Sequence, residues 1–112
     1  MVTEPVTGII RRYLQQLTKI GVGVAYGVVF GSQVRGNTND WSDIDLVVVS
    51  NRFDEPYSRE DVQQLWRVAA KVDSRIEPIA AGEKEFEEND SRAILEIARR
   101  EGEKIYLENV AI

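Results

Sequence analysis

The chain has 112 residues, of which 43% are hydrophobic and 29% charged, and this composition is that of a globular protein and excludes a disordered or fibrous one. Its formal net charge of -5 argues against an extended basic surface that would hold nucleic acid. Because the sequence has no cysteine and no histidine, disulfides and thiolate or imidazole metal sites are excluded, and any metal must be bound by oxygen.

The first part of the chain predicts a helix followed by two strands. Apolar residues recur at three- and four-residue steps from Val6 to Ile20, and Gly21 ends the pattern. The apolar segment 22–30 ends at a Gly-Ser pair, which favours a buried strand. A second strand is expected at 46–49, where three β-branched residues follow one another.

A second helix and a third strand are expected next. Residues 60–72 carry an apolar stripe, in which we interpret Trp66 as core, and Ser58 is a candidate N-cap. The strand at 75–80 contains Pro78, which cannot donate to a ladder, so we expect an edge strand or a short pairing.

The end of the chain predicts one more helix and one more strand. The helix covers 91–100, with Gly102 as its stop, and the short strand covers 105–107. The acidic run 83–90 is interpreted as a solvated short helix or turn rather than a metal site. The inward-facing residues of the last helix are expected to be the following: Ile94, Ile97 and Ala98.

This order of elements predicts an α/β fold with a small mixed β-sheet flanked by helices. We expect one domain that spans residues 1–112. No apolar run approaches the roughly 20 residues that span a bilayer, and the N-terminus does not have the pattern of a secretory signal, so a cytoplasmic location is expected.

Two aspartates, Asp43 and Asp45, stand directly before the apolar residues of the second predicted strand. Residues i and i+2 of a strand face the same side, so their carboxylates lie close together and repel each other unless a cation neutralises both. A magnesium-type ion suits such oxygen ligands. By itself, however, this triplet more often marks a strand with one solvated polar face.

Gly31 and Ser32 directly follow a buried strand, as a phosphate-binding turn does. Glycine lets the backbone approach a ligand closely, and the amides at the start of a following helix can bind an anion together with the Ser32 hydroxyl. Taken alone, this pair is also a common turn.

The combination of these features is more specific. An apolar strand, Gly-Ser, ten intervening residues, Asp-Ile-Asp and a second apolar strand resemble the nucleotidyltransferases of the DNA polymerase β superfamily. The stretch FGSQVRGNTNDWSDIDLVVVS is most similar to the minimal nucleotidyltransferase (MNT) domains, which occur in HEPN/MNT toxin–antitoxin pairs. This resemblance implies a nucleotidyltransferase (polymerase β palm-like) fold, a short mixed sheet with helices on one side.

The resemblance also implies roles for individual residues. Gly31 and Ser32 would hold the triphosphate, and Asp43 and Asp45 would bind the metals. A third carboxylate is expected from a later strand, and Glu77 is the candidate for this metal ligand or base, although a solvated edge-strand acid is the alternative. Two Mg²⁺ ions are expected, with Mn²⁺ as an alternative, and Asp43, Asp45 and Glu77 would hold them.

Three other residues near these motifs have open roles. Asp73 competes with Glu77 as the third carboxylate, but it ends a helical pattern, where a surface role is favoured. Arg35 either adds positive charge near the phosphates or forms a structural ion pair with Asp40 or Asp43. Trp41 either stacks on a base or packs as an anchor of its loop.

The resemblance implies transfer of a nucleoside monophosphate, AMP from ATP, to a hydroxyl acceptor. The leading hypothesis is a tyrosine of a partner HEPN-type helical toxin, with this chain acting as antitoxin. The alternatives are transfer to a small hydroxylated compound such as an antibiotic, and a non-catalytic protein-binding module with the same fold. An exposed edge strand and the last helix are candidate surfaces for a homo-oligomer.

Overall fold

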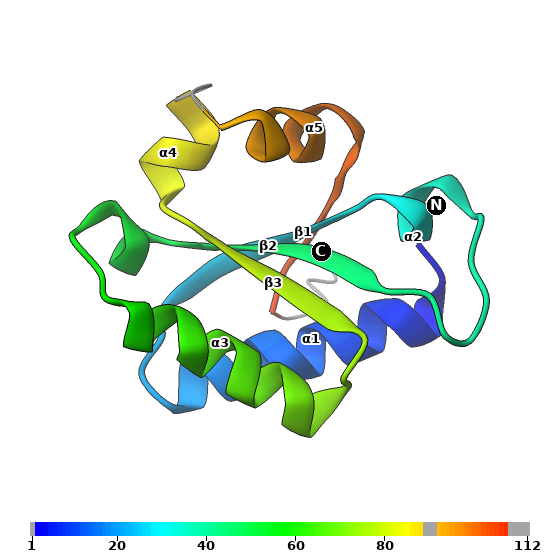
Figure 1. Cartoon of the computed structure of the whole chain (residues 1–112), viewed down its shortest axis with the longest axis horizontal. Coiled ribbons are helices and arrows are strands. Elements are labelled where there is room, and N and C mark those ends of the chain that lie inside the picture. Colours follow the sequence, from blue (N-terminus) through cyan, green and yellow to red (C-terminus); the bar gives the residue numbers. More distant parts are fainter. Residues whose placement is uncertain (1, 89–91, 108–112) are drawn as a thin grey trace, which may run out of the picture.

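The computed structural model describes residues 2–88 and 92–107 (Figure 1). Helices and strands alternate along much of the chain, as the sequence predicts. In chain order the elements are α1 (Glu4–Lys19), β1 (Val24–Phe30), α2 (Ser32–Arg35), β2 (Ile44–Ser50), η1 (Asn51–Asp54), α3 (Arg59–Val72), β3 (Ile76–Ala81), α4 (Glu83–Glu88), α5 (Ala93–Glu101) and β4 (Glu103–Ile105).

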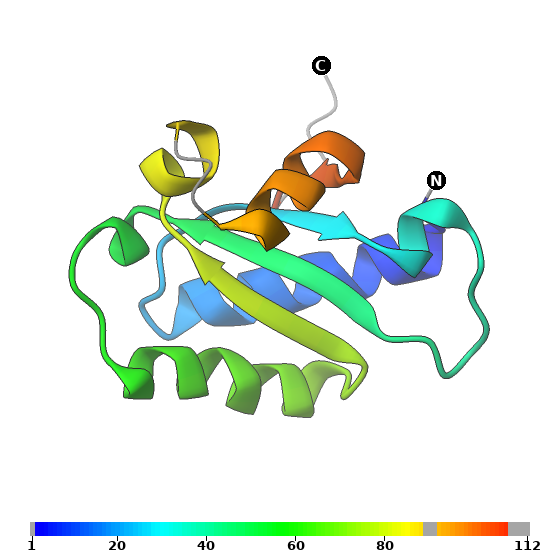
Figure 2. The same cartoon turned by 45° about the horizontal axis from the view of Figure 1, so that its top comes forward.

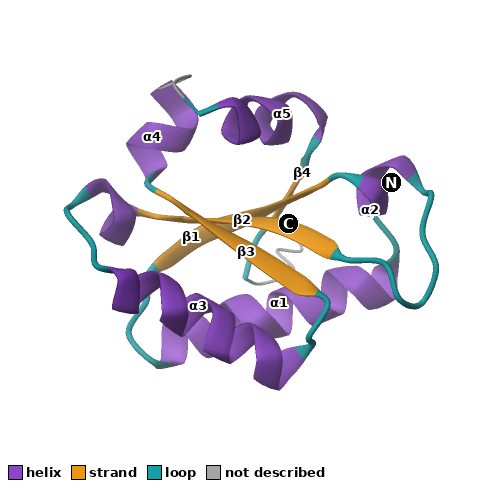
Figure 3. Cartoon of the chain, viewed as in Figure 1, coloured by secondary structure: helices purple, strands orange, loops and turns teal. Residues whose placement is uncertain are grey.

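The strands form one mixed sheet in the order β3-β2-β1-β4 (Figure 3). β1 is antiparallel to both β2 and β4, whereas β3 is parallel to β2. The expected edge position of the strand that contains Pro78 is confirmed, and Pro78 lies opposite Leu46 of β2. The predicted mixed sheet is therefore present.

Helices cover both faces of this sheet, so the expectation of helices on one side is wrong. Figure 2 shows α1 and α3 below the sheet and α4 and α5 above it. The reason lies in the strands themselves: Leu46 packs with the α1 and α3 side chains, and the next residue, Val47, packs with those of α4 and α5. Continuous apolar strands of this kind are buried on both faces.

The helix α5 packs by a different stripe from the one expected. Leu95 and Ala98 are fully buried, whereas Ile94 and Ile97 are each 37% exposed, so their predicted inward orientation is wrong. Positions 94 and 97 flank the buried stripe rather than lie at its centre. The helix starts at Ala93, and residue 91 of the predicted helix lies outside the described residues.

The prediction that Trp66 belongs to the core is also wrong. It lies on α3 but is 47% exposed, because this helix buries Leu65 and Ala69 instead. The start of the same helix is as predicted: the Ser58 hydroxyl accepts a hydrogen bond from the Asp61 amide, and the Asp61 carboxylate accepts one from the Ser58 amide, which completes a capping box.

The remaining segments agree in kind with the sequence. The acidic run forms the short helix α4 over residues 83–88, although Phe86 is buried against the second core, and residues 89 and 90 lie outside the described part. The last strand, β4, starts two residues earlier than predicted and is three residues long. Of the helices in the described ranges, none has the length and apolar character required to cross a membrane.

Candidate active site

Strand pairing brings the two parts of the sequence motif together. β1 and β2 are antiparallel, and Phe30, the last residue of β1, lies opposite Asp45. Gly31 follows with a φ of +77°, and a Cβ atom at this position would lie 2.6 Å from Asp45 Oδ2. Only glycine combines this backbone conformation with so close an approach to a carboxylate. The Gly-Ser turn and the aspartate triplet therefore form one site.

Glu77 lies beside Asp45 in the same sheet. The two residues are paired in the parallel register of β2 and β3, and they share the face on which Val47 and Ile79 pack. Burial raises the pKa of Glu77 first, and the negative charge of Asp43 and a hydrogen bond with Asp45 raise it further. Glu77 is thus an acid held close to both aspartates, as its candidate role requires.

Asp43 approaches the site from the loop before β2. The strand begins at Ile44, so Asp43 is not part of the ladder, and its side chain is exposed. In residues 2–88 and 92–107, no three acidic side chains converge closely enough to hold one metal ion. Carboxylates of like charge stay apart until a cation neutralises them. The groups that could bind such a cation here are carboxylate oxygens, which suit a hard divalent cation.

The competing carboxylate, Asp73, has a structural partner. It ends α3, and its oxygens accept hydrogen bonds from the guanidinium of Arg75 at 3.1 and 3.0 Å. These contacts, with the Arg75 side chain contributing most, hold the pKa of Asp73 below its ordinary value. The surface role expected for Asp73 agrees with this arrangement.

The turn after β1 is a short helix, α2. Gly31 is its N-cap, and the Gly31 carbonyl accepts hydrogen bonds from the amides of Val34 (3.1 Å) and Arg35 (3.2 Å). Ser32 is the first helical residue and is partly exposed, and it directly follows Gly31, which lies against the Asp45 carboxylate. The helix start that the sequence suggested after Gly-Ser is therefore present.

Neither Arg35 nor Trp41 has the structural role considered for it, which was an ion pair with Asp40 or Asp43 for Arg35 and packing in its loop for Trp41. Among the described residues, Arg35 faces Glu101 of α5 at 4.0 Å rather than Asp40 or Asp43, and both side chains of this pair are about half exposed. Trp41 is 87% exposed, so it is not a packed anchor of its loop.

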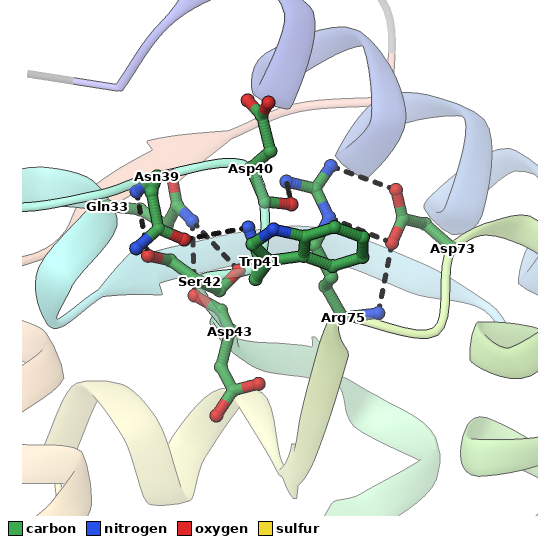
Figure 4. A network of polar contacts seen from close by, with 8 residues as sticks. All are labelled: Gln33, Asn39, Asp40, Trp41, Ser42, Asp43, Asp73 and Arg75. Carbon is green, nitrogen blue, oxygen red and sulfur yellow. Dashed lines mark hydrogen bonds and ion pairs between the residues drawn. The ribbon is translucent and has the colours of Figure 1, made fainter.

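Two residues near the site were not found by sequence reasoning. Figure 4 shows Gln33 of α2 and Arg75, just before β3, on either side of the segment that carries Asp43. Gln33 is polar but only 4% exposed, and its side-chain amide donates to the carbonyls of Ser42 and Asp43. The only sequence signal was a glutamine in a turn of small residues, which does not by itself indicate burial.

The family comparison agrees with this geometry. Residues 9–105 match the nucleotidyltransferase domain family. The matched range includes the sheet, both of its helical layers and all of the candidate site. The chain belongs to this family. The predicted class, a nucleotidyltransferase, is thereby confirmed, and this family generally uses divalent metals.

Solved structures show the same fold. A candidate nucleotidyltransferase from Sulfolobus solfataricus is similar with a TM-score of 0.57 and 20% identity, over 70% of this chain and 68% of that one. A toxin–antitoxin structure with AMP-PNP is similar with a TM-score of 0.59 and 16% identity, over 86% of this chain and 72% of that one. No curated protein matches the sequence.

Proposed function

We propose that this nucleotidyltransferase transfers AMP from ATP to a hydroxyl group, with Asp43, Asp45 and Glu77 as the metal ligands. The observation that supports this proposal most directly is the position of Asp45. Its carboxylate lies against Gly31, the expected triphosphate turn, and beside Glu77, the expected third acid. A strand aspartate that touches both groups can bring a metal ion and a phosphate to the same place.

The acids fit Mg²⁺ by their chemistry, and Mn²⁺ would suit the same oxygens. When bound, two such ions would neutralise the triphosphate and polarise the α-phosphorus. Asp45 is fixed by the ladders on both sides, and its rigid placement is what transfer of a phosphoryl-type group requires of a protein. Glu77, which lies beside Asp45 in the sheet, is the candidate to take the proton of the acceptor hydroxyl.

The other half of the site binds the triphosphate in this proposal. Gly31 gives the phosphates access to the backbone, because it has no side chain in front of Asp45. Ser32 supplies a hydroxyl at the start of α2. Arg35, at the end of the same helix, supplies positive charge, since its contact with Glu101 at 4.0 Å is long and exposed and is easily exchanged for a phosphate.

The proposed acceptor is a tyrosine of a small helical HEPN-type toxin, which this chain would inactivate as an antitoxin. Two findings support this choice. The similar toxin–antitoxin structure contains AMP-PNP, an analogue of ATP. The sequence also resembles the minimal nucleotidyltransferases of such pairs. A cytoplasmic location belongs to the same proposal, because the ATP and a toxin of this kind are found there.

The experiment that tests this function is a transfer assay with a HEPN-type protein encoded beside this chain. The two proteins are incubated with Mg²⁺ and ATP, and the intact mass of the toxin is measured. The expected result is a mass increase of one AMP on a tyrosine, which is absent with Asp45→Asn. An unmodified toxin together with an adenylylated antibiotic would replace this acceptor with a small hydroxylated compound.

A further inference from the structure

The peptide unit between Asp43 and Ile44 is held at both of its polar ends. Its carbonyl oxygen accepts a hydrogen bond from Gln33 Nε2 at 3.1 Å, and its N–H group donates to the carbonyl oxygen of Arg75 at 2.8 Å. The two partners come from different parts of the chain, α2 and the segment before β3 (Figure 4). Rotation of a peptide plane held in this way is restricted, which limits the directions in which the Asp43 side chain leaves the backbone.

Asp43 requires such support more than Asp45 does. Asp45 lies inside β2 and is paired with β1 and β3 on its two sides, whereas Asp43 precedes the strand and has no place in either ladder. A carboxylate on a loop would sample many directions. The contacts to the Asp43–Ile44 peptide replace the ladder at this position.

The burial of Gln33 is explained by this contact. Burying an amide is unfavourable unless its hydrogen bonds are made, and an apolar residue would fill the same space at a lower cost. Gln33 Nε2 donates to the carbonyls of Ser42 at 3.4 Å and Asp43 at 3.1 Å, and no buried side-chain nitrogen or oxygen in the described residues is without a partner. The buried amide therefore serves the loop rather than the core.

Arg75 is itself held rigidly. Its guanidinium binds both oxygens of Asp73, at 3.1 and 3.0 Å, and also donates to the Asp40 carbonyl at 3.3 Å. Asp73 Oδ1 accepts a further hydrogen bond from the Arg75 amide at 2.9 Å. The same residue thus fixes the loop through its side chain and the Asp43–Ile44 peptide through its main chain.

We infer that Gln33 and Arg75 are positioning residues, which orient the Asp43 carboxylate toward the metal through the Asp43–Ile44 peptide unit. This inference rests on the proposed function, because it assumes that Asp43 is a metal ligand. Residues that orient a metal ligand typically change metal affinity by roughly 10- to 100-fold when they are replaced. An effect of this size is expected for Gln33, whose contact to the carbonyl is direct.

The test measures Mn²⁺ binding to the protein without ATP, because ATP itself binds Mn²⁺, by the loss of the free-Mn²⁺ electron paramagnetic resonance signal, which requires no turnover. Gln33→Met keeps the length of the side chain and removes the donor. The expected result is a roughly 10- to 100-fold weaker Mn²⁺ affinity. The matched control is Gln15→Met, which removes a glutamine-to-carbonyl hydrogen bond of 2.9 Å to Leu107, far from the site, and leaves the Mn²⁺ affinity unchanged.

A double mutant shows whether Gln33 acts through Asp43. If it does, Gln33→Met combined with Asp43→Asn binds Mn²⁺ no more weakly than Asp43→Asn alone. If the losses of Mn²⁺ affinity in the two single mutants add up in the double mutant, the inference is overturned. It is also overturned if Gln33→Met binds Mn²⁺ as the wild type does while Asp43→Asn binds it more weakly. If Asp43→Asn itself binds normally, the proposed metal site fails and the inference fails with it.

A second variant keeps the test decisive if Gln33→Met does not give the circular dichroism spectrum of a folded protein. Arg75→Met removes the guanidinium contacts to Asp73 and the Asp40 carbonyl that hold Arg75 in place, so the Arg75 carbonyl that accepts from the Ile44 amide loses its fixed position. It is expected to weaken Mn²⁺ binding in the same assay, again without adding to Asp43→Asn. Unchanged Mn²⁺ affinity in folded Arg75→Met would overturn the inference.

Discussion

Asp45 and Glu77 lie opposite each other on the neighbouring parallel strands β2 and β3, and the pKa of Glu77 is raised there. Burial is the main cause of this rise, and the charges of Asp43 and Asp45 add to it. A protein gains no stability from placing ionised acids side by side at the end of a sheet. Their arrangement is explained if a cation binds between them. Functional sites commonly place like-charged side chains together at a cost in stability.

Glu77→Gln is expected to stabilise the metal-free protein while it removes activity. The folded-state pKa of Glu77 is raised, so its ionised form is unfavourable at neutral pH and the wild type regains this stability as the pH falls. We expect a melting temperature that is higher by roughly 2–4 °C at neutral pH in EDTA, as about 0.5 kcal/mol would give. This difference should shrink at acidic pH. A lower melting temperature at neutral pH would contradict the unfavourable ionisation of Glu77 beside Asp45.

The same variant is expected to lose transfer activity. If Glu77 takes the proton of the acceptor hydroxyl, the rate of AMP transfer should fall by about 10²–10⁴-fold. The assay is the mass-spectrometric one described for the toxin. A stabilised protein with wild-type transfer would show that Glu77 is a solvated edge acid and not part of the machinery.

Gly31→Ala should disrupt the site itself. Its Cβ would lie 2.6 Å from Asp45 Oδ2, and its φ of +77° is unfavourable for alanine. Gly36→Ala is the control, because Gly36 has a similar φ of +84° but, in the described part of the chain, no atom lies within 4 Å of the added Cβ. Gly36→Ala should lose about 1–2 kcal/mol of stability from backbone strain, because Gly36 is in the left-handed helical region, and Gly31→Ala, whose ψ of -144° lies outside that region, should lose at least as much.

Only Gly31→Ala is expected to impair transfer, by roughly 10²-fold or more, because it displaces the Asp45 carboxylate. The measurement is the transfer rate of each variant at a temperature where both remain folded. Equal activities of Gly31→Ala and Gly36→Ala would contradict the contact between the glycine turn and Asp45.

Asp61 should make the stability of the protein depend on pH. Its carboxylate accepts hydrogen bonds from the Ser58 amide at 2.8 Å and from Arg52 at 2.9 Å, and the Ser58 contact is the main reason why its pKa lies below the ordinary value of 3.8. A lowered pKa in the folded state stabilises the protein above that value, and this stability is lost as the pH falls through the lowered pKa.

Asp61→Asn is therefore expected to unfold at a lower urea concentration than the wild type at pH 7, and at the same concentration at a pH well below 3.8. The control is Glu55→Gln, which removes one negative charge from an exposed position outside the capping box. If Asp61→Asn unfolds at a lower urea concentration than the wild type in acid as well, and by the same difference as at pH 7, the carboxylate charge does not stabilise the start of α3.

Local sequence signals predicted most of the elements, because each signal acts within a few residues. The Ser58 N-cap, the Pro78 edge strand and the Gly102 helix stop depend on neighbouring residues only, and all three are present. Helix orientation was harder to predict. Trp66 and Ile97 belong to apolar stripes, but the packing of the sheet decides which side of the stripe is buried.

The site could be predicted in part for a similar reason. Asp45 and Glu77 stand at fixed places in strands and Gly31 directly follows one, so strand pairing brings the three together. Gln33 and Arg75 act on main-chain carbonyls, and Arg75 reaches a residue 35 positions away. Every residue has the same main-chain carbonyl acceptor, so the sequence does not indicate which residue accepts a hydrogen bond from the Gln33 or Arg75 side chain.

The central claim is that Asp45 joins a metal ion to the nucleotide. Calorimetric titration of ATP into the purified protein with Mg²⁺, and into Asp45→Asn under the same conditions, tests it most directly. The wild type is expected to bind ATP only when Mg²⁺ is present, and Asp45→Asn is expected to show no binding at the same concentrations. Equal ATP binding by the two proteins, or binding by the wild type that is unchanged in EDTA, would contradict the proposed site.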